Sequence, residues 1–212
     1  MRYNARMTSG TRKKSPRLVC TEPALIPTAT GTWKAIAFYD AADKTDGSTH
    51  VVFVMGDVAG AEDLPVRVQS ECMTSEVFGS LKCDCDGQLK MAMRHVRTRG
   101  RGAIVYLRQE GRGIGIFNKI RAYHLQDHGL DTVEANLKLG LPPDSREYGA
   151  AAAILRKLGV VSVRLMTNNP QKRKDLEAEG VKVTATIPLR TRPNRYNRDY
   201  LRIKKTRMGH DL

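Results

Sequence analysis

The sequence predicts an α/β fold with a mixed sheet, in which N-terminal antiparallel hairpins are followed by alternating strands and helices. Segments 33–39 and 51–55 are rich in β-branched and aromatic residues and flank the turn-prone segment 43–48, which indicates a hairpin. After residue 87, helical periodicities alternate with short apolar runs bounded by glycine. Because 212 residues with 41% hydrophobic content can close one core, we expect a single globular unit around a cysteine cluster.

A third short strand is expected after the hairpin. Val66–Val68 has β-branched residues at alternate positions, and it would carry Ser70, Glu71 and Cys72 to its end. The sheet therefore leads directly into the first cysteine.

The second half of the chain alternates helices and strands. A helix is expected over 88–99 with an apolar face and a stop at Gly100, followed by a buried strand over 103–107. The remaining elements are expected as a glycine-rich turn at 108–115, helices over 116–128 and 144–158, a strand over 160–166, a turn at 167–172, a helix over 171–179 and a strand over 181–187.

The net charge of +14 is concentrated at the two ends of the chain. Residues 1–20 and 190–212 carry +6 each, so only +2 remains for residues 21–189. Since charged ends are commonly solvated, we expect a disordered basic tail over 1–20, a folded domain over 21–189 and a basic tail over 190–212. A basic zinc-containing module that binds nucleic acid is the alternative from another functional class. The position of the charge, the 6% aromatic content and the lack of paired C-x2-C spacing argue against it, so we expect no nucleic-acid partner.

The composition also predicts the compartment. No apolar run approaches the ~20 residues that cross a bilayer, and the basic N-terminus has no apolar stretch behind it. Four cysteines grouped as three and one fit a reducing compartment in which thiols bind metal better than they fit a disulfide framework. We therefore expect a cytoplasmic protein without a membrane partner.

Three of the four cysteines, Cys72, Cys83 and Cys85, lie within fourteen residues of one another. This spacing offers three thiolates to a tetrahedral zinc ion and would leave the fourth position to water, as a hydrolytic zinc requires. Two other interpretations stay open. One is a structural zinc closed by a fourth ligand such as His95, and the other is a set of buried thiols without metal.

The glycine-rich turn at 108–115 joins a strand to the start of a helix. In that arrangement, backbone N–H groups and a helix N-terminus can bind phosphate. The turn has neither the Lys-Ser/Thr ending of a P-loop nor the G-x-G-x-x-G pattern. A plain strand-to-helix connection is therefore equally open.

Several motifs taken together resemble the GTP cyclohydrolase II family. They are RVQSECMT at 67–74, CDC at 83–85, RQEGRGIG at 108–115, NKIRAY at 118–123, DTVEAN at 131–136 and TNNP at 167–170, within a resemblance from about residue 65 to 189. The resemblance implies a zinc-dependent enzyme that opens the imidazole ring of GTP and releases formate and pyrophosphate. Its product would be 2,5-diamino-6-(5-phosphoribosylamino)pyrimidin-4-one, formed in the first step of riboflavin biosynthesis. The resemblance also implies magnesium on the triphosphate, a homodimer, and a catalytic domain over 21–189, and we expect no fused dihydroxybutanone phosphate synthase domain.

Carried over position by position, the resemblance assigns zinc to Cys72, Cys83 and Cys85. Bound zinc would lower the pKa of its water to ~7 and present hydroxide to guanine C8. Glu71 and Glu110 suit guanine N–H groups or magnesium, while Arg112 and Lys172 suit phosphate. The GTP contacts implied by the resemblance are Arg67, Val68, Gln69, Ser70, Glu71, Gln88, Glu110, Gly111, Arg112, Thr132, Thr167 and Lys172.

Three further positions match catalytic residues of the family. Asp144 matches the proposed proton acceptor, and Arg146 matches the proposed nucleophile at the α-phosphate. Because arginine stays protonated, charge stabilisation by Arg146 with water as the attacking group stays open, as does a helix cap with an ion pair. Tyr123 matches an active-site tyrosine, although its helical spacing from Ile116 and Ile120 would also suit a core.

The sequence departs from the family pattern at three places. Gln69 stands where the family usually has histidine, Asp86 stands where it has glycine, and residues 150–153 are alanines where the helix start is more polar. Glutamine forms hydrogen bonds but does not titrate, so a possible proton shuttle is missing. A divergent member that serves a secondary pathway and stops at the formamide-pyrimidine nucleotide is therefore an alternative.

Overall fold

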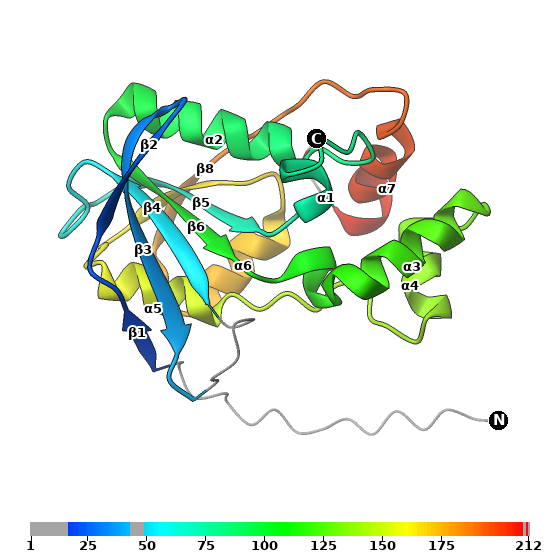
Figure 1. Ribbon diagram of the computed structural model, residues 1–212, viewed down its shortest axis with the longest axis horizontal. Coiled ribbons are helices and arrows are strands. Elements are labelled where there is room, and N and C mark those ends of the chain that lie inside the picture. Colours follow the sequence, from blue (N-terminus) through cyan, green and yellow to red (C-terminus); the bar gives the residue numbers. More distant parts are fainter. Residues whose placement is uncertain (1–16, 43–48, 210, 212) are drawn as a thin grey trace.

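Eight strands form one sheet within the described residues of the computed structural model, which are 17–42, 49–209 and 211 (Figure 1). The strands are β1 (Leu18–Cys20), β2 (Ala24–Thr28), β3 (Gly31–Asp40), β4 (His50–Met55), β5 (Leu64–Ser70), β6 (Gly102–Leu107), β7 (Val163–Met166) and β8 (Val183–Ile187). Their order in the sheet is β1-β3-β4-β6-β5-β7-β8, with β2 paired to β3. Strands β1, β2 and β4 each pair antiparallel with β3, and β4 pairs antiparallel with β6. The pairs β6–β5, β5–β7 and β7–β8 are parallel. The prediction of a mixed α/β fold is confirmed.

The predicted hairpin is present as β3 and β4, in which Ile36 pairs with Val52. Its turn at 43–48 lies outside the described residues. The predicted third strand is present as β5, and it ends at Ser70, immediately before Glu71 and Cys72. The sequence did not predict β2, which pairs with β3 in the register Ile26 to Trp33.

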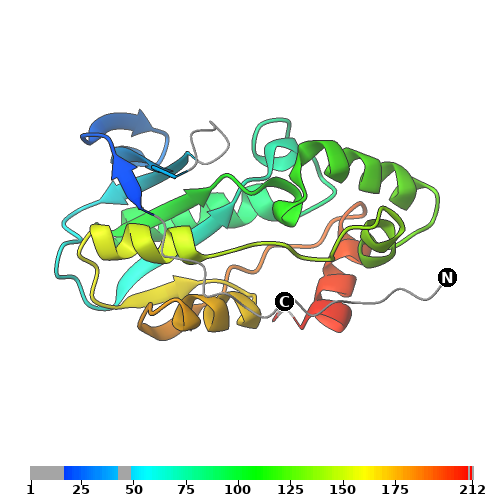
Figure 2. The ribbon, with the colours of Figure 1, turned by 90° about the horizontal axis from the view of Figure 1, so that it is seen from below.

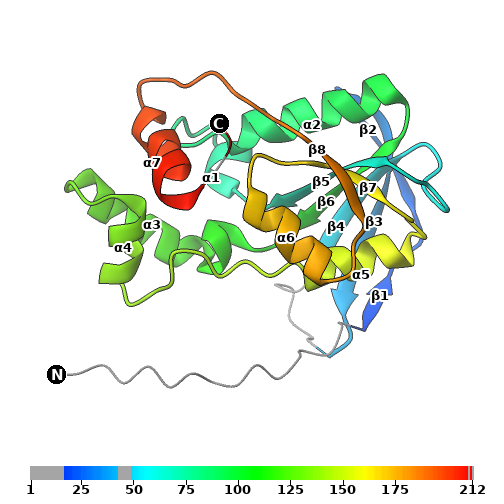
Figure 3. The same ribbon diagram turned by 180° about the vertical axis from the view of Figure 1, so that it is seen from behind.

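The helices are α1 (Met73–Glu76), α2 (Cys85–Arg99), α3 (Gly115–Asp127), α4 (Thr132–Lys138), α5 (Gly149–Lys157), α6 (Pro170–Ala178) and α7 (Arg198–Met208), and a short 3₁₀ turn spans Glu110–Gly113. Helix α2 covers one face of the sheet, and α5 and α6 cover the other (Figures 2 and 3). Side chains of β6 pack alternately against the two layers of helices. Val105 packs with Ile154 of α5, whereas Ile104 packs with Val96 of α2, because successive strand residues point to opposite faces.

Helix α2 follows the predicted periodicity closely. Ala92 and Val96 are fully buried against the sheet, and Leu89 and Met93 pack at the edge of this cluster. Gly100 ends the helix in a left-handed conformation with φ of 69°, which glycine adopts without the penalty of a side chain. Cys85 is the first residue of α2, so the packing of this helix fixes one cysteine relative to the sheet.

The parallel strands direct their carboxyl ends toward one region of the molecule. Strands β5, β6 and β7 end at Ser70, Leu107 and Met166, and α1, α3, α4 and α7 gather beyond these ends (Figure 1). Ligand sites of open parallel sheets form at the carboxyl ends of the strands. The functional residues should therefore lie here.

One predicted helix is shorter than expected. Residues 144–148 are not helical, and α5 begins at Gly149. The backbone N–H of Ser145 donates to the Arg112 carbonyl at 2.9 Å, and that of Arg146 donates to the Asp144 carboxylate at 3.1 Å. Asp144 and Arg146 therefore lie in a connecting segment against the glycine-rich turn and do not cap a helix.

The ends of the chain also differ from the predicted tails. Residues 1–16 lie outside the described residues, but Leu18–Cys20, predicted as disordered, form β1 because their backbone pairs with β3. The segment 190–212 contains helix α7, which packs Leu201 and Lys204 into the structure. The division of the chain at residues 20 and 190 remains a prediction.

No helix within residues 17–42 and 49–209 combines the length and the apolar character that crossing a bilayer requires.

Candidate functional site

The sulfur atoms of Cys72, Cys83 and Cys85 lie within 4.8 Å of one another, and those of Cys72 and Cys83 are 3.7 Å apart. Cys72 follows β5, Cys83 lies in the loop before α2, and Cys85 begins α2. All three are free thiols. In the described part of the chain, these three residues form the one group of His, Cys, Asp and Glu donors placed to share a metal ion, so His95 does not join them. Three converging thiols match the donor set of zinc.

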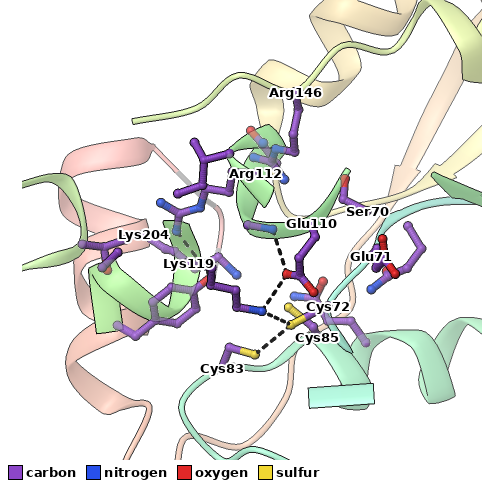
Figure 4. Close-up of a pocket in the computed structure, with 18 of the residues that line it drawn as sticks. Ser70, Glu71, Cys72, Cys83, Cys85, Glu110, Arg112, Lys119, Arg146 and Lys204 are labelled. Carbon is purple, nitrogen blue, oxygen red and sulfur yellow. Dashed lines mark hydrogen bonds and ion pairs between the residues drawn. The ribbon is translucent and has the colours of Figure 1, made fainter. Parts of the chain in front are cut away.

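A lysine that the sequence analysis did not single out reaches the thiol cluster. The Nζ atom of Lys119 in α3 lies 3.2 Å from Cys72 Sγ and 2.7 Å from Glu110 Oε1 (Figure 4). Hydrogen bonds with Cys83 and Cys85, together with the charge of Lys119, lower the pKa of the Cys72 thiol despite its burial. Burial by itself would lower the pKa of Lys119, but the nearby Tyr123, Glu110 and Cys72 raise it, so the ammonium stays charged.

Glu110 connects the thiol cluster to the glycine-rich turn. Its Oε2 accepts from the Met73 N–H at 2.7 Å, and its Oε1 accepts from Lys119 and from the Gly111 N–H. The Glu110 side chain is buried, and both of its oxygens are already bonded next to the cysteines. It therefore aligns α1, α3 and the turn around the same point.

The glycine-rich turn has an unusual backbone. Gly111 and Arg112 have φ of 62° and 60°, and Gly113 has φ of 88°. A Cβ atom at Gly113 would lie 2.8 Å from the Ser145 carbonyl oxygen, so only glycine fits at this close approach. The left-handed conformation of Arg112 is uncommon for a residue with a side chain, and such backbones gather at functional sites.

Cationic side chains gather around the cavity that contains the cysteines and this turn. Within the described residues, the cavity is lined by six cations and two acids: Arg67, Arg112, Lys119, Arg146, Lys172 and Lys204 against Glu71 and Glu110. This excess of positive charge, held largely in buried positions, suits a polyanionic ligand.

Two of these cations have little protein bonding of their own. The Nη1 atom of Arg112 is buried and has no hydrogen-bond partner, as far as the described residues show. The Nζ atom of Lys172 donates to the Val68 carbonyl at 2.6 Å. Burial, followed by the charges of Arg67 and Arg146, pushes the pKa of Lys172 well below its usual range. An anion bound in this cavity would pair with both cations.

Arg146 is held by Asp144 in a bidentate ion pair, in which Nε donates to Oδ1 at 2.9 Å and Nη2 donates to Oδ2. Burial would lower the pKa of Arg146, but the ion pair with Asp144 outweighs it, so this pKa is raised. Likewise, burial would raise the pKa of Asp144, and Arg146 lowers it overall. The pair is therefore fully charged, with the guanidinium at the cavity wall.

Gln69 lies inside a buried chain of hydrogen bonds. Its Oε1 accepts from Arg67 Nε at 2.8 Å, and its Nε2 donates to Glu76 Oε1 at 2.6 Å. The side chain is 1% exposed. Glu76 is held in turn by the Tyr106 hydroxyl, which donates to it at 2.5 Å. Because both the oxygen and the nitrogen of the Gln69 amide are bonded, Gln69 orients Arg67.

A second chain of hydrogen bonds leads from Arg67 to the C-terminal helix. Arg67 Nη2 donates to Gln88 Oε1 at 2.7 Å, and Gln88 Nε2 donates to Asp84 Oδ2 at 2.6 Å. Asp84 lies between Cys83 and Cys85, and its Oδ1 accepts from Lys204 Nζ at 2.9 Å. Residues from α7 thus reach the segment that carries the cysteines.

Tyr123 lies at the cavity wall with its ring centroid 5.7 Å from Lys119 Nζ. The interpretation of Tyr123 as a core residue does not apply, because Ile116 and Ile120 on the same helix face are 37% and 52% exposed. The departure at Asp86 lies in the first turn of α2, where the carboxylate pairs with Lys90 at 2.8 Å.

The structure brings nearly all the predicted residues to one cavity, including Ser70, Glu71, Gln88, Thr132 and Thr167. Two do not line it. The Val68 side chain is fully buried in the core and contributes its carbonyl, and Asp144 acts through Arg146. The sequence analysis missed Lys119, Tyr200 and Lys204. Lys119 lies one helical turn before Tyr123, a spacing that could have revealed it, whereas nothing local marks Tyr200 and Lys204.

Comparison with known proteins adds a family and several relatives. The family model described as GTP cyclohydrolase II matches residues 20–188. A protein of Nocardia farcinica named riboflavin biosynthesis protein RibBA is 49% identical over 209 residues, which cover 98% of this chain and 50% of the relative. Proteins of the same name from Porphyromonas gingivalis and Bacillus subtilis are each 50% identical, covering 88% of this chain and 45% and 46% of the relatives. The chain spans about half the length of the curated relatives it matches.

Proposed function

The chain belongs to the GTP cyclohydrolase II family, and from this we propose that it hydrolyses GTP, opening the imidazole ring at C8 with release of formate and pyrophosphate. The product is 2,5-diamino-6-(5-phosphoribosylamino)pyrimidin-4-one, and the reaction is the first step of riboflavin biosynthesis. One observation carries the proposal. The three cysteines and the cluster of cations share one cavity, so a metal-dependent reaction and a triphosphate can be accommodated together.

Cys72, Cys83 and Cys85 are the residues that would hold one zinc ion per chain. Bound zinc supplies a nucleophile at neutral pH by lowering the pKa of water to about 7. Lys119 contributes a positive charge beside Cys72, which offsets the excess negative charge of three thiolates. Glu110 holds this lysine, and so keeps the charge at the cluster.

The cations Arg112, Arg146 and Lys172 bind the triphosphate, together with magnesium. Their positions support this assignment because an anion would satisfy the buried Arg112 Nη1 and would compensate for the burial of Lys172. Thr132 and Thr167 add hydroxyl donors at the same wall. Ser70 and Glu71 directly precede Cys72, and Gln88 donates to Asp84 between the other two cysteines, so these lining residues are available to a guanine base beside the metal.

Arg146 stabilises charge at the α-phosphate while water attacks, and Asp144 keeps the guanidinium charged and oriented. The raised pKa of Arg146, caused by the ion pair with Asp144, supports this role over that of a nucleophile, which would need a neutral guanidine. Pyrophosphate is the leaving group.

Tyr123 holds the opened ring in place for the second hydrolysis, which releases formate. Its ring faces the cavity beside Lys119, in a position to contact the intermediate. The alternative, in which the divergent Gln69 stops the reaction at the formamide, is an outcome of the experiment below.

The protein is proposed to be a cytoplasmic homodimer. Two exposed apolar segments support association with a second copy. Phe78, after α1, is 76% exposed and Phe117, on α3, is 73% exposed. Exposed aromatic side chains of this size are common at protein interfaces.

The experiment is to incubate the zinc-loaded protein with magnesium and GTP and to identify the product by mass, with formate and pyrophosphate measured in parallel. Cys83→Ser should lose both zinc and turnover, whereas Cys20→Ser, at an exposed position away from the cluster, should keep both. Full turnover by metal-free protein would contradict the proposal. A product that retains the formyl carbon would establish the formamide alternative.

A further inference from the structure

Helix α7 and the segment before it contact the loop that carries the cysteines, here called the thiol loop (residues 81–85). Asn194 Nδ2 donates to the Leu81 carbonyl at 3.3 Å, and Asn197 Nδ2 donates to the Cys83 carbonyl at 3.4 Å. Lys204 Nζ pairs with Asp84 Oδ1 at 2.9 Å. The C-terminal part of the chain therefore contacts the thiol loop at three successive points (Figures 1 and 3).

The same helix contacts the turn at 110–113, here called the nucleotide loop. The Tyr200 hydroxyl accepts from Arg112 Nη2 at 3.3 Å, and its ring centroid lies 5.6 Å from the guanidinium carbon of Arg112. Lys204 Nζ lies 5.0 Å from the centroid of the same ring. Tyr200 thus stands between Arg112 on one loop and the lysine that holds the other loop.

The Lys204–Asp84 ion pair is costly to bury. The side chains of Lys204 and Asp84 are 9% and 1% exposed, and a buried ion pair is commonly no more stabilising than apolar residues of the same volume. Asp84 lies between Cys83 and Cys85 in the sequence, and its hydrogen bonds continue through Gln88 to Arg67. Apolar residues at positions 204 and 84 could pack α7 equally well, so the ion pair indicates a role beyond packing.

The hydrogen bonding of Arg112 is a second reason to assign α7 a role in the site. Its Nη2 is held by Tyr200, while its Nη1 is buried and has no hydrogen-bond partner among the described residues. Arg112 lines the cavity, so a hydrogen-bond acceptor of a bound ligand would satisfy this nitrogen. An oxygen of a phosphate group fits this position.

We propose that α7 is a positioning element of the active site, in which Tyr200 orients Arg112 for phosphate binding and Lys204 orients Asp84 and thereby the zinc ligands beside it. The assignment rests on the proposed function for the identity of the ligands. It makes the basic C-terminal segment a part of the site, so that the thiol loop and the nucleotide loop reach their working arrangement only when α7 is docked.

The test uses two variants of the full chain with separate readouts. Tyr200→Phe keeps the ring and removes the hydroxyl, so the Kd of magnesium pyrophosphate should rise about tenfold, the lower end for a lost hydrogen bond to a charged group. Its zinc affinity should not change. Lys204→Met should weaken zinc binding about 10- to 100-fold in competition with a chelator, as loss of an outer ligand partner does. Its pyrophosphate affinity should change much less.

Two controls separate positioning from general stability. Lys205→Met changes the neighbouring, exposed residue of α7 and should leave both affinities at the wild-type value. Lys204→Arg retains a cation for Asp84 and should recover most of the zinc affinity. Thermal unfolding of each metal-free variant shows whether α7 is still folded.

The expected result is a crossed pattern, in which Tyr200→Phe weakens only pyrophosphate binding and Lys204→Met weakens mainly zinc binding. If each variant changes both affinities in parallel with its loss of thermal stability, or if neither variant changes either affinity, α7 is only a packing element and the inference is wrong. Neither readout requires turnover of GTP. A protein that shows the crossed pattern but does not consume GTP would disprove the proposed function and leave this inference intact.

Discussion

The ammonium group of Lys119 lies 3.2 Å from the sulfur of Cys72, and it is held there by the Glu110 carboxylate at 2.7 Å. A buried lysine beside a cluster of three thiols counteracts the repulsion between thiolates when a divalent metal is bound. This contact ties α3 to the end of β5. It also explains why the lysine stays charged at a position that is 8% exposed.

Replacing Lys119 should weaken the metal site without removing a ligand. In Lys119→Met, the negative charge of the thiolates is less compensated, so we expect zinc affinity to fall about 10- to 100-fold. Competition with a chromogenic chelator measures this. Arg121→Met, on the same helix but exposed, is the matched control and should bind zinc as the wild type does. Equal affinity in both variants would show that Lys119 does not act on the metal site.

Lys172 should make phosphate binding depend on pH. Burial and the charges of Arg67 and Arg146 depress its pKa in the free protein, and a bound phosphate would raise it again. Nucleotide binding should therefore take up a proton at any pH between these two values, and affinity should fall as pH rises through that window. Titration calorimetry of magnesium pyrophosphate in buffers of different ionisation enthalpy measures the uptake.

Lys172→Arg is the control for that measurement, because arginine keeps its charge throughout the same range. Proton uptake should disappear in this variant. Uptake of the same size in Lys172→Arg would assign the proton to another group.

Gln69→His should lower activity rather than restore a missing proton shuttle. The amide accepts from Arg67 and donates to Glu76 at the same time, and at 1% exposure there is no room for a different shape. An imidazole would have to satisfy both partners with a shorter reach. We expect a rise in KM for GTP from misplacement of Arg67, together with a loss of stability of about 1–3 kcal/mol for an unsatisfied buried group. A faster enzyme would show that a titrating group is what this position lacks.

Tyr123→Met should separate the two hydrolyses. The cysteines are untouched, so the ring of GTP should still open, but the opened ring loses the aromatic ring beside Lys119 and the phenolic hydroxyl. We therefore expect the formamide-pyrimidine nucleotide to accumulate, as detected by mass, while formate release falls. Tyr123→Phe isolates the hydroxyl. If the wild-type protein itself stops at the formamide, Tyr123 is not sufficient for the second step.

The local sequence by itself determined much of this protein. Val66–Val68 predicted a strand leading to Cys72, the spacing in 88–99 predicted α2 with its stop at Gly100, and the spacing of the cysteines predicted a shared metal site. These features depend on neighbours a few residues apart, through periodicity, glycine conformation and side-chain chemistry. The glycine-rich turn was also visible, although its contact with Ser145 was not.

The tertiary structure decided what those local signals leave open. Residues 144–148 continue a helical pattern in the sequence, but their backbone bonds to the Arg112 carbonyl and to Asp144 prevent a helix. Lys204 lies 120 residues from Asp84 in the sequence, and a basic segment looks the same whether it is solvated or buried against a distant carboxylate. Only the closed fold brings a charge and its partner together and removes water from between them, and that step places Lys204 of the basic C-terminal segment in the wall of the site.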